Sequence, residues 1–164
     1  MVPEVYRAGI IGTRTMTNIE PIVRIFTACS YSFHVNLKGI SHEESLKVPL
    51  PGMNCANWVA GHIVKYKYDV LEALGVDKPA EDFSRYDRQK TFVPEDAASI
   101  EELVTLSREL SDTIVDKLKQ REWSETGEDV EVLTRISFWG FHESYHVGQL
   151  GMLRKALGKD GAIQ

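Results

Sequence analysis

Two histidines near the C-terminus, His142 and His146, lie four residues apart in the stretch FHESYHVGQLGMLRKALG, residues 141–158. Residues at this spacing lie one turn apart on the same face of an α-helix, so both imidazoles point in one direction. Two neutral imidazoles on one face can share a metal cation. The alternative is a pair of core histidines whose nitrogens bond to Tyr, Ser or backbone groups. Because both histidines fall on an apolar stripe, the spacing favours a metal.

The same stretch fits the zinc-peptidase pattern H-E-x-x-H, in which the glutamate is a general base. The longer metzincin pattern requires Gly and His where this chain has Gln149 and Met152. Other zinc peptidases use a downstream acidic ligand, and Asp160 is the sole acid in the 18 residues that follow the second histidine. Glu143 lies about 100° round the helix from His142, so it is expected to face sideways, toward a neighbouring helix or solvent. The peptidase interpretation therefore lacks a third ligand and is disfavoured.

Four amphipathic segments, at about 18–38, 54–74, 99–118 and 130–157, have apolar residues at helical spacing and must position these histidines. Residues 76–97 form the longest connection, long enough to run the length of a bundle. No strand pair is apparent, so the chain is predicted to be an all-α four-helix bundle. Capping boxes are predicted from Thr17 with Glu20 and from Ser99 with Glu102, helix-start residues are Asn54 and Asn57, and helix ends are Gly39, Gly75 and Gly158.

A metal at the two histidines needs a third ligand from another segment. His42 lies in a charged loop and is expected to be solvated, and His34 lies beside the apolar stripe of residues 18–38. His62, in NCANWVAGHIVKY, neighbours Val59 and Tyr66 at helical spacing. Its position fits a metal ligand and a half-buried, hydrogen-bonded histidine equally well. The predicted inward seam of residues 130–157 consists of Trp139, His142, His146, Gln149, Leu153 and Ala156.

Several other residues could take part in such a site. Cys55 lies seven residues before His62 and is either a fourth ligand or, as favoured here, a small buried hydrophobe. Gln149 could order a metal-bound water or make a plain helix contact. Tyr66 and Tyr145 could donate protons or fill the core with their hydroxyls at its edge. The sequence offers no strong general base.

Two motifs, NWVAGHI at residues 57–63 and the stretch 141–158, resemble the DinB-like metal-binding bundle family and its YfiT-like thiol-transferase relatives. The resemblance extends over nearly the whole chain from residue 18. It implies an up-down-down-up bundle with a long crossover between the second and third helices. Residue by residue, His62, His142 and His146 match the ligands of a three-histidine site for a divalent metal, with zinc or nickel as typical occupants.

The resemblance further implies metal-dependent chemistry like that of S-transferases and isomerases that use a low-molecular-weight thiol such as bacillithiol or mycothiol. Because the same site could also hydrolyse a polarised bond, we predict a transferase or a hydrolase that acts on a small molecule. Three neutral imidazoles leave a metal its full charge and an open position, at which water or a thiol has a lowered pKa. The alternative is a non-catalytic metal-binding or stress-response bundle, which the lack of an acid–base partner favours. An open cavity over the metal would favour the enzyme, and a plugged site the module. A homodimer is expected by resemblance.

Composition sets the remaining bounds. The net charge is −5, and no Lys/Arg run stands out, which disfavours nucleic acid and anionic membranes as partners. No apolar run has transmembrane length and the N-terminus lacks a secretory signal, so a cytoplasmic protein is expected. Cys29 and Cys55 have no C-x-x-C partner and are expected to be reduced. The predicted organisation is an N-terminal extension, 1–16, and one bundle domain, 17–160.

Overall fold

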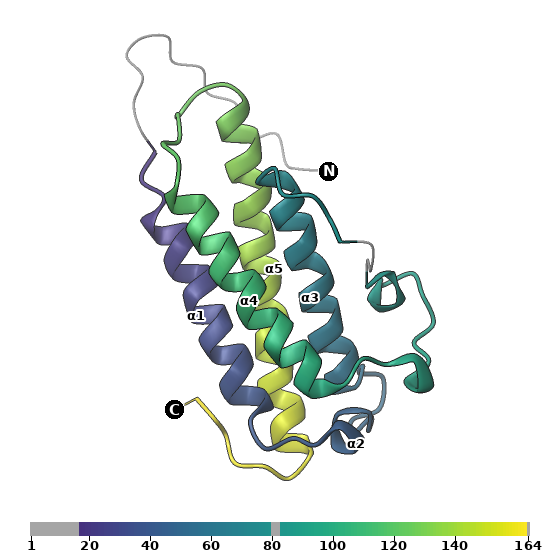
Figure 1. Ribbon diagram of the computed structural model, residues 1–164. Helices are drawn as coiled ribbons and strands as arrows, with labels where there is room; N and C mark the ends of the chain where they lie inside the picture. The colour runs from purple at the N-terminus through teal and green to yellow at the C-terminus, as the bar shows by residue number, and fades with distance from the viewer. Residues whose placement is uncertain (1–16, 80–82, 164) are drawn as a thin grey trace.

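The computed structural model describes residues 17–79 and 83–163, so the predicted extension at 1–16 lies outside the described residues. Four long helices form an all-α bundle, as predicted (Figure 1). Its elements are α1 (Glu20–Leu37), α2 (His42–Ser45), α3 (Ala56–Ala73), the short 3₁₀ helices η2 (Ser84–Tyr86) and η3 (Pro94–Asp96), α4 (Ile100–Lys119) and α5 (Glu128–Ala156). Among these helices, none combines the length and apolar character that crossing a lipid bilayer requires.

The long helices run in two directions. In Figure 1, α1 and α5 run one way and α3 and α4 run the other, which is the expected up-down-down-up order. Each of α4 and α5 packs against both α1 and α3. The connection between α3 and α4 carries the chain back along the bundle, so that α4 begins at the same end as α3. The predicted crossover is thereby confirmed.

Local sequence explains most helix ends, but the capping box at Thr17 was a wrong prediction. The helix α1 begins at Glu20, too late for Thr17 to cap it, and Asn18 Oδ1 instead accepts a hydrogen bond from the Glu20 amide at 3.0 Å. Ser99 Oγ accepts from the Glu102 amide at 3.1 Å, which is one of the two hydrogen bonds of the capping box predicted for the start of α4. Glycines follow the ends of α1, α3 and α5 with φ of 74°, 80° and 79°, in the left-handed region that ends helices.

The start of α3 differs from expectation. Cys55, rather than Asn54 or Asn57, caps the helix, and its Sγ accepts a hydrogen bond from the Trp58 amide at 3.4 Å. Asn57 is buried and accepts a hydrogen bond from the Tyr86 hydroxyl at 3.0 Å. This asparagine therefore ties α3 to the crossover segment.

The charged loop expected around His42 contains the short helix α2. Its capping box is complete, because the Ser41 hydroxyl accepts from the Glu44 amide and the Glu44 carboxylate accepts from the Ser41 amide. His42 is half-buried rather than solvated, and its Nδ1 is buried without a hydrogen-bond partner in the described part of the chain.

The inward seam predicted for α5 is displaced from the real one. The buried residues of α5 are Leu133, Ile136, Gly140, Glu143, His146, Val147, Leu150 and Leu153. Of the predicted seam, His146 and Leu153 are buried, whereas Ala156 is exposed. The core stripe passes through Glu143, about 100° round the helix from His142, so the predicted seam is the edge of the buried face.

Candidate metal centre

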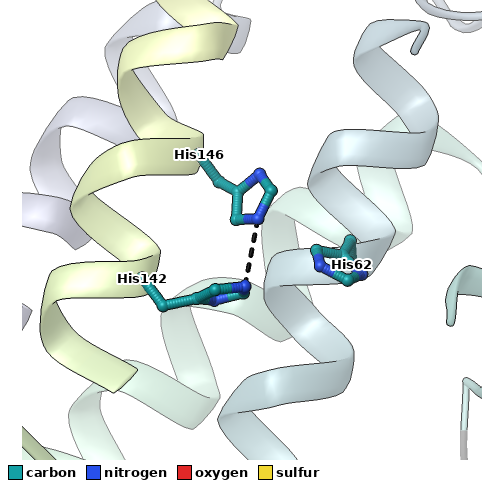
Figure 2. A group of neighbouring side chains, drawn as sticks. All are labelled: His62, His142 and His146. Carbon is teal, nitrogen blue, oxygen red and sulfur yellow. Dashed lines mark hydrogen bonds between the residues drawn. The ribbon is translucent and has the colours of Figure 1, made fainter. Parts of the chain in front are cut away.

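Three histidines from two helices meet beside the core. His142 and His146 extend from α5 toward His62 on α3 (Figure 2). Their potential ligand atoms all lie within 4.8 Å of one another. The imidazole centroids are 4.4 Å apart for His142 and His146, and 4.7 Å apart for His62 and His146. The structure therefore brings together the three predicted site residues, and we call them the histidine cluster.

The ring of His62 is fixed from two sides. Its Nδ1 lies 2.8 Å from the carbonyl oxygen of Tyr86, to which it donates. Because a neutral imidazole has one proton, this bond leaves Nε2 as the nitrogen with a free lone pair. The indole of Trp58 stacks on the ring at a centroid distance of 4.5 Å. Gly61 makes room for Tyr86, since a Cβ there would lie 2.3 Å from the Tyr86 ring.

The ring of His146 is held by Gln149 one turn further along α5. The amide nitrogen of Gln149 donates to the Tyr145 hydroxyl at 3.2 Å, so the amide oxygen is free to accept from His146 Nδ1 at 2.7 Å. His146 Nε2 then has a free lone pair, and it lies 3.1 Å from His142 Nε2. In the metal-free protein His142 is therefore the donor in this contact.

Burial keeps the cluster uncharged at neutral pH. It lowers the pKa of His62 to about 4 and, together with the charges of its neighbours, that of His142 to about 4. Burial also lowers the pKa of His146, opposed by the hydrogen bond with Gln149. Metal ligation requires neutral imidazole, so no proton has to leave a charged ring before a cation binds.

The donor set and its spacing fit a divalent metal. Two nitrogens bound to one tetrahedral zinc are about 3.3 Å apart, and His142 Nε2 and His146 Nε2 are 3.1 Å apart. An oxygen acceptor on the remote nitrogen of a metal-binding histidine is a common feature of metal sites, and His62 and His146 each have one. Cys55 does not belong to this group of potential ligands.

Aromatic side chains surround the cluster. The ring of Tyr66 lies 4.3 Å from that of His142, and the ring of Tyr145 lies 5.1 Å from that of His146. Phe138, which is exposed, stacks at 6.3 Å on His142. His142 is itself half-buried, so the cluster lies near the surface.

A sequence model of the DinB superfamily matches residues 27–150, a range that contains all three histidines and most of the four long helices. This chain belongs to the DinB superfamily. No curated protein and no solved structure matched the chain significantly. Membership agrees with the bundle and with the cluster, whereas the role of the histidines as ligands stays a prediction.

In this DinB superfamily chain, the glutamate of the H-E-x-x-H match does not face the cluster's cation position as a peptidase base would. Glu143 is 5% exposed and its Oε1 lies 2.7 Å from Lys67 Nζ on α3. Of the two directions left open for it, the glutamate points toward a neighbouring helix and not toward solvent. This ion pair is further evidence against the peptidase interpretation.

Sequence reasoning missed three contributors to the site. The Tyr86 carbonyl comes from the crossover, 24 residues from His62, and no local pattern indicates it. For Gln149, the sequence indicates a role near the site but not its hydrogen bond with His146. Lys67 lies four residues after Ile63 and three before Val70, so the apolar stripe of α3 could have placed it in the core.

Proposed function

We propose that this protein is a metal-dependent enzyme in which His62, His142 and His146 bind one divalent metal, zinc or nickel. It acts on a small molecule, as a transferase that uses a low-molecular-weight thiol or as a hydrolase. The observation that carries the proposal is the pair of oxygen acceptors, Tyr86 O and Gln149 Oε1, that hold the remote nitrogens of His62 and His146. They leave unprotonated nitrogens of neutral rings for a cation.

The bound metal would lower the pKa of a water or thiol in its open position. The protein's own residues set the rest of the chemistry. Tyr145 is exposed, and its hydroxyl accepts from Gln149, so its own proton is available to a substrate. The rings of Tyr66 and Phe138 beside His142 offer an apolar surface for the body of a small substrate.

Metal analysis tests the ligand assignment. Protein purified without a histidine tag and incubated with zinc or nickel should contain about one equivalent of metal. His62→Ala should contain less than about a tenth of an equivalent. His34→Ala is the matched control, because His34 is a half-buried histidine bonded to the Ser30 and Val104 carbonyls, outside the cluster. Equal metal content in wild type and His62→Ala would refute the proposal.

Activity assays separate the two reaction classes. Conjugation of bacillithiol or mycothiol to a chromogenic aryl halide tests thiol transfer, and hydrolysis of a chromogenic ester tests hydrolase activity. The active reaction should disappear with a chelator and return with metal. The rate of that reaction should be lost in His62→Ala and kept in His34→Ala.

A second candidate function is a non-catalytic metal-binding bundle. It is favoured by the rings of Trp58, Tyr66 and Tyr145, which pack around the cluster. Cobalt-loaded protein distinguishes the candidates. A small thiol added to it should change the visible absorption if the metal has an accessible position, and should leave the spectrum unchanged if the side chains plug the site.

We also propose that the protein pairs with a second copy through an uncharged face of α5. Between Arg135 and Arg154 the helix has one charged residue, the buried Glu143. Phe141, 69% exposed, and the exposed Met152 lie on this face, and large exposed apolar surfaces are typical of interfaces. Light scattering should give a dimer, and Phe141→Lys should give a monomer. A wild-type monomer at micromolar concentration would refute pairing.

A further inference from the structure

A charged pair lies in the core between the two helices that form the histidine cluster. Lys67 on α3 is 1% exposed, and its Nζ donates to Glu143 Oε1 on α5 at 2.7 Å. The same Nζ donates to Ser111 Oγ on α4 at 2.6 Å, and Ser111 Oγ donates to the Ser107 carbonyl at 2.7 Å. The network joins α3, α4 and α5, and its members are buried.

Stability does not explain such a pair. Removing both charges from water costs several kcal/mol per ion, and apolar residues of similar volume are often as stable or more stable in the same place. What an ion pair adds is geometry. Apolar faces pack in several rotations and registers, whereas a buried lysine and carboxylate are satisfied in one arrangement.

The pair is well placed to set the geometry of the cluster. Glu143 directly follows His142 on α5, and a step of one residue turns about 100° round the helix. With Glu143 directed at Lys67, His142 and His146 lie at the edge of the buried face, opposite His62. A rotation of α5 that broke the ion pair would turn both rings relative to His62 by the same angle.

We infer that Lys67 and Glu143 are positioning residues that hold α5 in the rotation at which the three histidines converge on a metal. This inference rests on the proposed metal site. It assigns the pair to the affinity and coordination of the metal rather than to the stability of the fold. Neither residue belongs to the group of potential ligands in the described part of the chain.

The test replaces the pair by apolar residues in the full chain, as Lys67→Met with Glu143→Leu. The metal-free variant should unfold at the wild-type temperature or above. Its affinity for cobalt and zinc should fall about tenfold or more, as when an orienting group is lost from a metal site. The visible spectrum of the cobalt-loaded protein should change as well. Glu20→Leu with Arg24→Met, at an exposed pair on α1, is the matched control and should leave both unchanged.

Each result decides the inference. Wild-type metal affinity and an unchanged cobalt spectrum in the double variant would overturn it. Failure of the metal-free double variant to fold, seen by circular dichroism, would assign the pair to the fold and also overturn it. Glu143→Asp, which keeps the charge but shortens the side chain, should fold and bind metal with an intermediate affinity. A wild-type protein that binds no metal would instead refute the proposed function, and the inference with it.

Discussion

Two polar groups in this bundle join the same helices, α3 and α5, but they differ in charge and in access to solvent. The histidine cluster is uncharged at neutral pH because burial lowers the pKa of His62 and His142 to about 4, and His142 is half-buried. The ion pair of Lys67 and Glu143 is closed to solvent, since Lys67 is 1% exposed and Glu143 is 5% exposed. We call it the sealed pair. One group is reachable from outside and the other is not.

The difference suits each group to a separate task. A site that takes up a metal and a substrate needs neutral donors and an open side. Neutral imidazoles cost less free energy to bury than charged groups do. An ion pair in the core is costly to bury and cannot exchange with solvent, so it is suited to hold one arrangement of the helices. Removal of one partner of the sealed pair should therefore act first on folding, because it leaves a buried charge unpaired, whereas loss of a cluster histidine should act on metal binding.

The largest effect is expected when the sealed pair loses one partner. Lys67→Met leaves the Glu143 carboxylate buried without a counter-charge, so the free energy of unfolding should fall by about 3 to 5 kcal/mol. Urea denaturation of the metal-free protein measures this change. Arg24→Met removes the positively charged partner of Glu20 from an exposed ion pair. The free energy of unfolding should then fall by no more than about 1 kcal/mol. A loss at Lys67 as small as that at Arg24 would remove the contrast between the two groups.

Loss of a cluster histidine should act on metal binding instead. His62→Ala removes one of three donors, and the metal affinity should fall more than about 100-fold, beyond the range for orienting groups. Competition with a chromogenic chelator gives the dissociation constant, and His34→Ala is the control. An affinity within about threefold of wild type would show that His62 is not a ligand.

The pH dependence of stability should separate the groups next. Unfolded histidine has a pKa of about 6.5, and that of folded His62 is about 4, so the unfolded chain binds more protons between these values. The free energy of unfolding of the metal-free protein should therefore fall as the pH is lowered through this window, by about 3 kcal/mol from His62. The contribution of His62 to the free energy of unfolding should be fully present above a pH of about 6.5 and lost below a pH of about 4.

Urea unfolding at a series of pH values checks this expectation. His62→Gln removes the titrating ring, so its curve should be flatter than that of wild type between pH values of about 6.5 and 4. Parallel curves for the two proteins would contradict the depressed pKa of His62.

The smallest effect is expected at the outer partner of the cluster. Gln149→Leu removes the acceptor for His146 Nδ1 but none of the three donors, so metal affinity should fall about tenfold. The fold should be unaffected, because Gln149 is half-buried and bonds only within α5 among the described residues. The same chelator competition measures it, and an affinity equal to wild type would show that Gln149 does not orient His146.

Much of this architecture could be predicted from local patterns. The helical spacing of apolar residues gave the four long helices to within a few residues, and the spacing of His142 and His146 placed both rings on one face. Glycine after α1, α3 and α5 marked the helix ends, because the left-handed backbone there suits a residue without a Cβ. The convergence of His62 with these two residues came from the family resemblance, and the geometry agrees with it.

Other features depended on groups that are far apart along the chain. Periodicity indicates which residues of α5 share a face, but not which edge of that face meets α3, so the seam was predicted about 100° from its centre. Lys67 is in the core because Glu143 and Ser111 arrive from two other helices to satisfy its charge. The bond between His62 and the Tyr86 carbonyl requires the crossover to fold back over α3. Short-range sequence sets helices and faces, whereas the rotation of each helix and the partners of buried polar atoms follow from packing of the whole bundle.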